Sequence, residues 1–303
     1  MDRPALVDAL LARCELPVPD DGDRAVTCAV SGGADSLALL VLARAAGLEV
    51  TAVHVDHGLH PGSAAEAGVV AEAAARFGAA FRAERVEVAA GPNLEARARA
   101  ARYAVLPAGV LTGHTADDQA ETVLLNLVRG SGLDGLAGMR SVGHGIGPRR
   151  PLLALRRAET AALCTALGLQ PVVDPSNHDP AHRRNRIRHE LLPLADSIAE
   201  RDVAALLARQ ATLLRDEADL LDGLAADIEP ADGLALATAH PALARRAVRR
   251  WLVTTCPGSH PPDAATVERV LAVARNERRA CELAGGWRVE RHGGKLSIIA
   301  PHP

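Results

Sequence analysis

The fold of this chain is decided by the stretch AVTCAVSGGADS at residues 25–36. Its first six residues form a mostly apolar run, typical of a buried strand in a parallel sheet, and a segment with helical periodicity begins at Asp35. The two glycines between them allow the backbone to approach a ligand closely. Because the N–H groups in the first turn of a helix have no partner within the helix, this junction predicts a phosphate-binding site.

The same alternation of strand and helix continues along the chain to about Arg129. We expect strands at residues 25–30, 49–55, 81–88 and 109–112, each followed by a helix, at 35–46, 63–77, 94–106 and 116–129. This order predicts an α/β fold built on a parallel sheet. Ligands bind at the carboxyl ends of parallel strands, so Ser31, Asp56 and His114 should face one crevice.

The remainder of the chain is expected to be mainly helical. It should begin with a glycine-rich loop at 131–150, followed by a helix at 156–167 and by a loop leading into a short helix across 173–193. A long helix is expected at 197–226. After it we expect helices at 241–254 and 264–275 and a hairpin at 281–299. We therefore predict a catalytic domain at 1–195, a helical connector at 196–230 and a second, smaller, mainly helical C-terminal domain at 231–303.

Composition limits the class of protein. Of the 303 residues, 48% are hydrophobic, so the chain can bury a core and a wholly disordered protein is excluded. Five scattered cysteines without a Cys-x-x-Cys pair argue against a disulfide framework or a zinc site. No apolar stretch reaches the roughly 18 residues of a membrane span, and the start of the sequence lacks the basic region of a signal peptide. We therefore expect a cytoplasmic protein with no membrane partner.

The charge pattern limits how the chain could bind nucleic acid. The formal net charge is −3, so RNA contacts must come from local patches, and these must consist of arginine because Lys295 is the only lysine. Two candidate patches are the run at 183–188 and the quartet Arg245, Arg246, Arg249 and Arg250 on a predicted helix. Solvated surface charge is the alternative for both.

The segment SGGADS at 31–36 differs from two common nucleotide-binding motifs. It lacks the Gly-Lys-Ser/Thr of a Walker loop and the G-x-G-x-x-G of a dinucleotide-binding turn. A carboxylate inside a phosphate-binding loop suggests that Mg²⁺ bridges Asp35 to phosphate oxygens. In the alternative interpretation, Asp35 only caps the helix after a tight turn.

This segment resembles the PP-loop of the N-type ATP pyrophosphatases, whose fold is of the adenine nucleotide alpha hydrolase-like type. These enzymes cleave ATP between its α and β phosphates and pass AMP to an oxygen. Three further segments are similar to the lysidine synthetases of that superfamily: HVDHGL at 54–59, GHTADDQAET at 113–122, and the tract 174–193. The chain departs from the family at His60, where an arginine is usual.

The resemblance implies a ligase that uses ATP and Mg²⁺ to adenylate the C2 oxygen of the wobble cytidine in the CAU anticodon of tRNA(Ile). The ε-amine of free lysine would then replace that oxygen and form lysidine, which changes codon reading from AUG to AUA. The products would be AMP and pyrophosphate. A homodimer is consistent with the same resemblance.

The resemblance also implies a set of site residues. ATP would be bound by Ser31, Gly32, Gly33, Ala34, Asp35, Ser36, His54, Asp56 and Arg99, with the metal on Asp35. Catalysis would depend on Asp35, His114, Asp118 and Glu121, and lysine would be bound by Asp117, Asp118 and Glu121. The tRNA would be contacted by Arg102, Arg184, Arg186, Arg188, Arg245 and Arg249.

The residues themselves leave simpler alternatives open for several of these roles. Acids such as Asp118 and Glu121 could hold an ammonium group or a metal, but acids at a helix start are also ordinary partners of the helix dipole. His114 could be a structural histidine at a strand end. Arg99 and Arg102 could be solvated arginines of an amphipathic helix.

Other classes of protein are alternatives to a lysidine synthetase, and each predicts a different sequence feature. A PP-loop tRNA thiolase generally needs paired cysteines, and no suitably placed pair exists in this sequence. A GMP or NAD synthetase would lack the segment at 113–122. A non-catalytic nucleotide-binding or RNA-binding regulator predicts a damaged loop or missing acids, and the sequence has neither.

Overall fold

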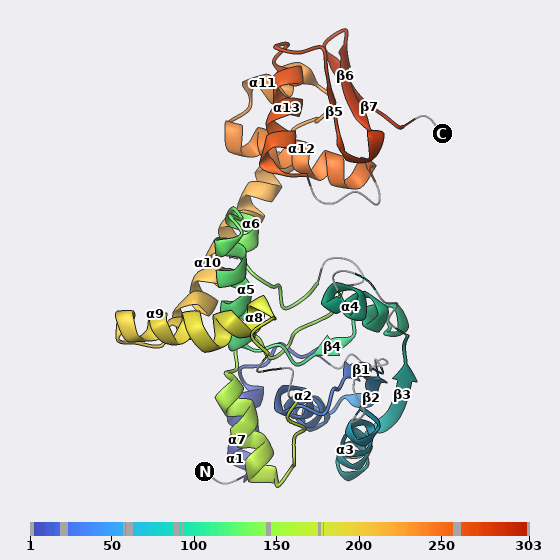
Figure 1. The fold of residues 1–303 in the computed structure, drawn as a ribbon, viewed down its shortest axis with the longest axis vertical. Coiled ribbons are helices and arrows are strands. Elements are labelled where there is room, and N and C mark those ends of the chain that lie inside the picture. Colours follow the sequence, from blue (N-terminus) through green and yellow to red (C-terminus); the bar gives the residue numbers. More distant parts are fainter. Residues whose placement is uncertain are drawn as a thin grey trace. The chain divides into compact units, whose positions relative to one another are not determined.

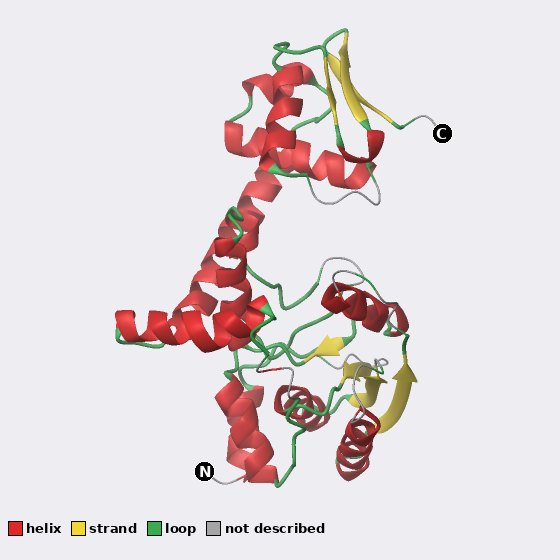
Figure 2. Cartoon of the chain, in the orientation of Figure 1, coloured by secondary structure: helices red, strands yellow, loops and turns green. Residues whose placement is uncertain are grey.

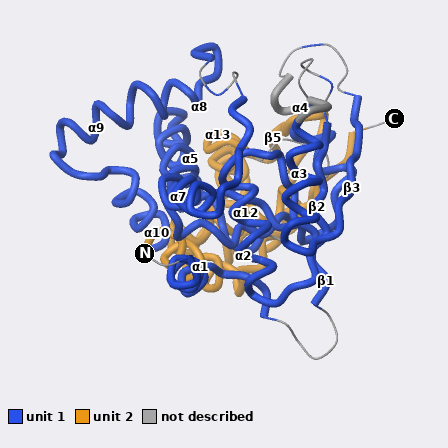
Figure 3. Tube along the Cα trace, turned by 90° about the horizontal axis from the view of Figure 1, so that it is seen from below, with its two compact units in different colours: residues 1–212 blue, residues 213–303 orange. Residues whose placement is uncertain are grey.

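The computed structural model of the chain describes residues 3–18, 24–56, 58, 63–87, 91, 94–143, 147–174, 177, 179–256 and 262–301. Parts of the sequence motifs, among them His57, His60, Pro175 and Ser176, lie outside the described residues. The chain divides into two compact units, Met1–Thr212 and Leu213–Pro303 (Figure 3). The division falls inside α10 (Val203–Ala226). The predicted domain limits at 195 and 230 stay predictions.

A four-stranded parallel sheet forms the centre of the first unit (Figure 2). Its strands are β1 (Ala25–Ala29), β2 (Glu49–Asp56), β3 (Ala80–Arg85) and β4 (Leu111–Thr112), in the order β3-β2-β1-β4. β1 pairs on both sides, because Ala25 lies opposite Glu49 of β2 and Cys28 lies opposite Leu111 of β4. The predicted parallel sheet is confirmed, with all four strands in the expected places.

Each strand leads into the helix that was predicted after it. These helices are α2 (Ala34–Ala45), α3 (Ser63–Arg76), α4 (Leu94–Val105) and α5 (Ala116–Val128). α2 lies deepest in the core, and its Leu37, Leu39, Leu40 and Leu42 have no exposed surface. Packing on so many sides fixes the N-terminus of α2, which is the end that carries the candidate phosphate site.

Two helices that do not belong to the alternating series of strands and helices pack on α2 (Figure 1). α1 (Arg3–Leu11) was not predicted, because its hydrophobic pattern is weak. α7 (Arg157–Leu167) was predicted, and it ends as expected at Gly168, whose φ is 65°. Both helices pack on α2 and on each other.

The signature tract at 183–193 forms a continuous but irregular helical segment. α8 (Arg183–Arg186) runs into a π-helical turn at Ile187–Leu191 and then into α9 (Leu192–Ala199). The sequence predicted a loop leading into a short helix, and the structure shows more helix than that. A π-helical turn inside a helix is common at functional sites.

Before this tract, α6 (Leu133–Leu136) interrupts the glycine-rich segment that was predicted to be a loop.

The second unit combines helices with a small antiparallel sheet. Its elements after α10 are α11 (Gly233–Thr238), α12 (Pro241–Thr255), α13 (Ala264–Ala274), β5 (Ala280–Glu282), β6 (Arg288–His292) and β7 (Lys295–Ile299). The predicted hairpin is confirmed, and Gly293 and Gly294 both have positive φ in its turn. Val270, Leu271 and Val289 lie at the centre of this unit's core.

Among the described residues, no helix combines the length and apolar character that crossing a membrane would require.

Candidate active site

The carboxyl ends of β1 and β4 border a cavity of about 520 Å³. This volume lies in the range of small-molecule and cofactor sites. Predicted site residues that line the cavity are Ser31, Gly33, Ala34, Asp35, Ser36, Arg99, Arg102, His114, Asp118 and Arg188. Two of the three residues expected to share a crevice, Ser31 and His114, therefore meet in it, whereas Asp56 does not line it.

The PP-loop is held in its bend by its own polar groups. The Ser36 hydroxyl accepts a hydrogen bond from the Ser31 N–H at 3.2 Å and donates one to the Gly33 carbonyl at 2.9 Å. Gly32 has a φ of 91°, and a Cβ there would lie 3.1 Å from Val172 Cγ2. Glycine is thus favoured at this position by both conformation and space. Ala34 begins α2, so the first N–H groups of that helix are available to an anion.

Gly113 allows the end of β4 to lie directly against the PP-loop. A Cβ at this position would lie 2.7 Å from the carbonyl oxygen of Asp35 and 3.0 Å from the backbone nitrogen of Ser36. Both neighbours are backbone atoms of the loop and of the first turn of α2, so they have little freedom to move. The GHT segment therefore fixes the distance between β4 and the phosphate-binding turn.

Replacing Gly113 with alanine is expected to displace the PP-loop. A misplacement of about 1 Å in a catalytic group typically costs about 10²-fold in rate, and we expect a loss of that order in ATP-dependent pyrophosphate release. Gly68→Ala in α3 is the matched control, because no atom lies within 4 Å of a Cβ built there. Equal activity of the two variants would contradict this role of Gly113.

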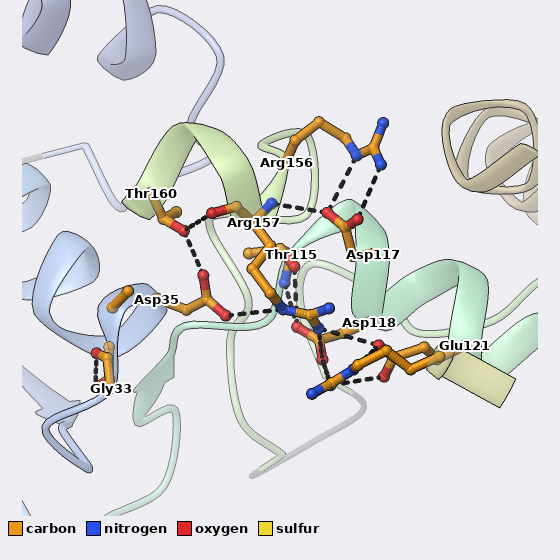
Figure 4. Close-up of polar contacts among 12 residues, drawn as sticks. Gly33, Asp35, Thr115, Asp117, Asp118, Glu121, Arg156, Arg157 and Thr160 are labelled. Carbon is orange, nitrogen blue, oxygen red and sulfur yellow. Dashed lines mark hydrogen bonds and ion pairs between the residues drawn. The ribbon is translucent and has the colours of Figure 1, made fainter. Parts of the chain in front are cut away.

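Asp35 is a carboxylate at the cavity wall with two side-chain partners (Figure 4). It accepts a hydrogen bond from the Thr160 hydroxyl, and Arg157 Nε lies 3.6 Å from its Oδ2. Burial raises the pKa of Asp35 to about 6, and the nearby Asp118 acts in the same direction, while Thr160 and Arg157 oppose them. The raised pKa indicates that the negative charge of Asp35 is not fully compensated by its neighbours. A further cation would therefore stabilise the ionised carboxylate.

The donor set around Asp35 fits Mg²⁺ of the substrate-bridging kind. The described residues include no group of three or more His, Cys, Asp or Glu side chains able to enclose a metal. Mg²⁺ in nucleotide sites is commonly held by one or two carboxylates together with substrate phosphates, and Asp35 at the phosphate-binding turn matches that arrangement.

The acids at the start of α5 are engaged by two arginines at the start of α7 (Figure 4). Asp117 accepts hydrogen bonds from Arg156 Nη2 at 2.9 Å and from the Arg157 N–H at 2.7 Å. Asp118 caps α5 by accepting from the Thr115 N–H at 2.9 Å, and it also accepts from Arg157 Nη2 at 3.0 Å. Hydrogen bonds and positive charges of this kind outweigh burial and hold the pKa of both carboxyls below the usual range.

Glu121, one turn further along α5, is completely buried and surrounded by three guanidinium groups. Its carboxylate accepts from Arg157 Nη2 at 3.1 Å, from Arg184 Nε at 2.7 Å and from Arg188 Nε at 2.6 Å. A buried charge of this type is tolerated only when it is paired. Arg184 and Arg188, predicted to contact tRNA, thus direct their guanidinium groups at Glu121 in this structure, and their role in tRNA binding stays a prediction.

His114 is hydrogen-bonded to a hydroxyl at the end of β4. Its Nδ1 lies 2.9 Å from the Thr112 hydroxyl, which also lies 3.1 Å from the Arg149 carbonyl oxygen. When the hydroxyl donates to that carbonyl, Nδ1 carries the ring proton and Nε2 is an acceptor. Burial lowers the pKa of His114 to about 4, so the ring is neutral near pH 7. A neutral imidazole at the cavity wall can accept a proton or a hydrogen bond.

Three predicted ATP-binding residues, Gly32, His54 and Asp56, are not among those that line the cavity. Val53 and Val55 of β2 line it, and His54 between them faces the other side of the sheet, where its Nδ1 lies 3.1 Å from the Val30 carbonyl oxygen. Asp56 accepts a hydrogen bond from the Gly58 N–H at 2.7 Å. Their role in ATP binding stays a prediction.

The remaining predicted arginines differ in their surroundings. Arg99 lies over the ring of Tyr103, 5.1 Å from its centroid, at the cavity wall. Arg186 is exposed and forms an ion pair with Glu190 at 2.9 Å. In the second unit, Arg245 pairs with Glu268 at 2.6 Å, and no hydrogen bond or ion pair is described for Arg249.

Sequence reasoning missed the residues that α7 brings to the site. Arg156, Arg157 and Thr160 contact Asp117, Asp118 and Asp35, and all three lie in or directly before the first turn of α7. The available signal was a pair of arginines at a predicted helix start, where the dipole disfavours positive charge and a specific anionic partner is to be expected.

Comparisons with known proteins agree with this geometry. A family model described as "PP-loop domain" matches residues 8–195, and one described as "TilS substrate binding domain" matches residues 234–297. The tRNA(Ile)-lysidine synthase of Nocardia farcinica is 48% identical over 242 residues, which cover 76% of this chain and 76% of that protein. The tRNA(Ile)-lysidine synthase of Salinispora arenicola is 40% identical over 335 residues, covering 99% and 97%.

Among solved structures, the chain is similar to a U34-tRNA thiolase from Methanococcus maripaludis. The TM-score is 0.56 with 16% identity, and the match covers 70% of this chain and 80% of that one. At this level of identity the similarity concerns the fold alone.

The family model of the PP-loop domain matches more than half of the chain, and the parallel sheet and the bend after β1 agree with it. Together they define the class of this protein as a PP-loop enzyme that uses ATP. Within that class, the chain belongs to the tRNA(Ile)-lysidine synthase family.

Proposed function

We propose that the chain is an ATP-dependent ligase that adenylates the C2 oxygen of the wobble cytidine in the CAU anticodon of tRNA(Ile) and then joins lysine to C2. The observation that carries the proposal is the meeting of the PP-loop, Asp35, His114 and Arg157 around one cavity, in a chain of this family. Oxygen at C2 of cytosine is a poor leaving group, so its replacement by an amine needs activation of this kind.

In the first step, ATP lies with its phosphates against the N-terminus of α2. The C2 oxygen attacks the α-phosphorus, the bond to the β-phosphate breaks and pyrophosphate leaves. Mg²⁺, held by Asp35, would supply charge neutralisation at the phosphates. The first N–H groups of α2, with Arg99 and Arg188 at the cavity wall, stabilise the developing negative charge. In the tautomer with the ring proton on Nδ1, His114 can accept a hydrogen bond at Nε2 from the base or the ribose.

In the second step, the lysine ε-amine attacks C2 and AMP leaves with the former C2 oxygen. The amine has an unperturbed pKa of about 10.4, so it must lose a proton first. Asp118 is favoured over Glu121 as the partner of the ammonium group, because Asp118 lines the cavity and Glu121 is completely enclosed. Asp117 and Glu121 then act mainly by holding the surrounding arginines.

Lysine must compete for Asp118 with an arginine. Arg157 contacts both Asp118 and Glu121, and it also lines the cavity where the triphosphate is proposed to lie. Bound phosphates attract the Arg157 guanidinium and weaken its contact with Asp118, so ATP binding prepares the site for the ammonium group. Lysine is therefore expected to bind after ATP. A homodimer, by contrast, stays a prediction from the resemblance.

A thiolase reaction is not favoured for this site. All five cysteines are free, and none of them lines the described cavity.

Pyrophosphate release measured with one substrate omitted at a time tests the proposed function. With ATP and the tRNA(Ile) transcript but no lysine, we expect at most one pyrophosphate per enzyme, because the adenylated tRNA stays bound. Adding lysine should give multiple turnovers. A transcript with guanosine in place of the wobble cytidine is the control and should release none. Rapid release without tRNA would contradict the proposal.

A further inference from the structure

Apart from Arg249 on α12, the arginine and lysine side chains of the second unit fall into two groups. In the first group each cation has a partner, as in the pairs Arg245–Glu268, Arg288–Glu290 and Lys295–Asp232. Arg246 and Arg250 are likewise bound, to Asp222 and to the Ala225 carbonyl. These cations already have partners within the unit, so they gain less from an external anion than a cation without a partner.

The second group lies where α13 ends and β5 begins. It consists of Arg275, Arg278, Arg279 and Arg291, and none of these guanidinium groups forms a hydrogen bond or ion pair with any residue that the structure describes. Arg275 is the C-cap of α13, Arg278 and Arg279 precede β5, and Arg291 lies on β6. We call these four residues the α13–β5 arginine cluster.

The strand register brings like charges together within the cluster. Ala280 of β5 lies opposite Glu290 of β6, and the Arg291 N–H donates to the Arg279 carbonyl at 3.0 Å. Arg279 and Arg291 are therefore cross-strand neighbours. Like charges directly opposite each other destabilise a sheet. The dipole at the C-terminus of α13 favours a cation at Arg275, but it does not account for the opposed pair.

We infer that the α13–β5 arginine cluster binds the phosphodiester backbone of an RNA. Guanidinium groups match phosphate oxygens in geometry, and binding would relieve the repulsion between Arg279 and Arg291. Backbone contact suits this chain, because only 2% of its residues are aromatic and broad base-stacking platforms are lacking. That the RNA is tRNA(Ile) rests on the proposed function. The cluster differs from the α12 arginines that the sequence suggested for this role.

A binding assay with matched charge removals tests the inference. Arg278→Gln with Arg279→Gln removes two unpaired cations, and Arg288→Gln with Lys295→Gln removes two paired ones from the same unit. Binding of the tRNA(Ile) transcript is measured without ATP or lysine over a series of salt concentrations. We expect the first variant to lose about tenfold in affinity, with a slope of log affinity against log salt smaller by about 2. The second variant should stay within about threefold of the parent chain.

A single substitution gives an independent readout. Arg291→Gln is expected to raise the melting temperature of the free protein, because it removes the cross-strand repulsion, and at the same time to weaken RNA binding. Loss of stability together with unchanged RNA binding would overturn the role of Arg291.

The remaining outcomes separate this inference from the proposed function. Equal losses in the two double variants, or a loss only in Arg245→Gln with Arg249→Gln, would overturn the assignment of the cluster. Failure of the parent chain to bind tRNA would overturn both proposals. Binding through the cluster without any pyrophosphate release on addition of ATP would leave the RNA surface standing and refute the ligase reaction.

Discussion

Replacing Asp35 with asparagine is expected to lower the rate of pyrophosphate release by roughly 10²-fold or more. Asparagine keeps the size of the side chain but cannot supply the negative charge that would hold Mg²⁺ at the phosphates. Removal of one group that stabilises charge in a transition state typically costs about 10²–10³-fold. The measurement is single-turnover pyrophosphate release with saturating ATP and tRNA.

Glu159→Gln is the matched control for the loss of Asp35. Glu159 lies on α7 near the site, and its carboxylate pairs with Arg13 at the protein surface and accepts a hydrogen bond from the Arg156 N–H. Both substitutions remove one negative charge close to the start of α7, so a general electrostatic effect would appear in both. Near-normal release by the Asp35 variant, or equal losses in the two variants, would show that Asp35 does not act on the phosphates.

Replacing Glu121 with glutamine is expected to destabilise the protein by about 3–5 kcal/mol, the usual cost of removing one partner from a buried ion pair. Glu121 has no exposed surface, and its carboxylate is the common partner of Arg157, Arg184 and Arg188. Glutamine fills the same space but leaves three positive charges close together without their counter-ion. Urea unfolding, with the slope compared between variants, measures the change in free energy.

The control for Glu121 is Glu190→Gln, which also separates a glutamate from an arginine. The Glu190–Arg186 pair is exposed, with side-chain exposures of 53% and 61%, and exposed pairs contribute about 0–1 kcal/mol. A small effect of Glu121→Gln, comparable to that of Glu190→Gln, would show that the arginine cluster does not depend on this carboxylate. Activity of a Glu121 variant must therefore be compared at equal fractions of folded protein.

The fold could be predicted from the sequence because its strong signals are local. Apolar strands, helix periodicity and the stop at Gly168 each depend on a few neighbouring residues, and the structure confirms them. α1 was missed because its apolar residues do not form a clear stripe. The π-helical turn at Ile187–Leu191 was missed because nothing in the local pattern distinguishes it from an α-helix.

The candidate site could be predicted only in part. Strand order was enough to bring the PP-loop and His114 together, because parallel strands end at one edge of the sheet. The pairing of Asp118 with Arg157 depends on how α5 and α7 pack, 39 residues apart in sequence, and no local rule gives it. For the same reason the sequence could not indicate that Arg184 and Arg188 meet the buried Glu121.

The fate of the C2 oxygen tests the proposed mechanism most directly. A tRNA(Ile) transcript is prepared with a heavy-oxygen label at C2 of the wobble cytidine and is incubated with the protein, ATP, Mg²⁺ and lysine. If the C2 oxygen attacks the α-phosphorus and leaves when the amine adds, mass spectrometry will find the label in AMP. Label that stays in the RNA, or that appears in pyrophosphate, would contradict adenylation of the base.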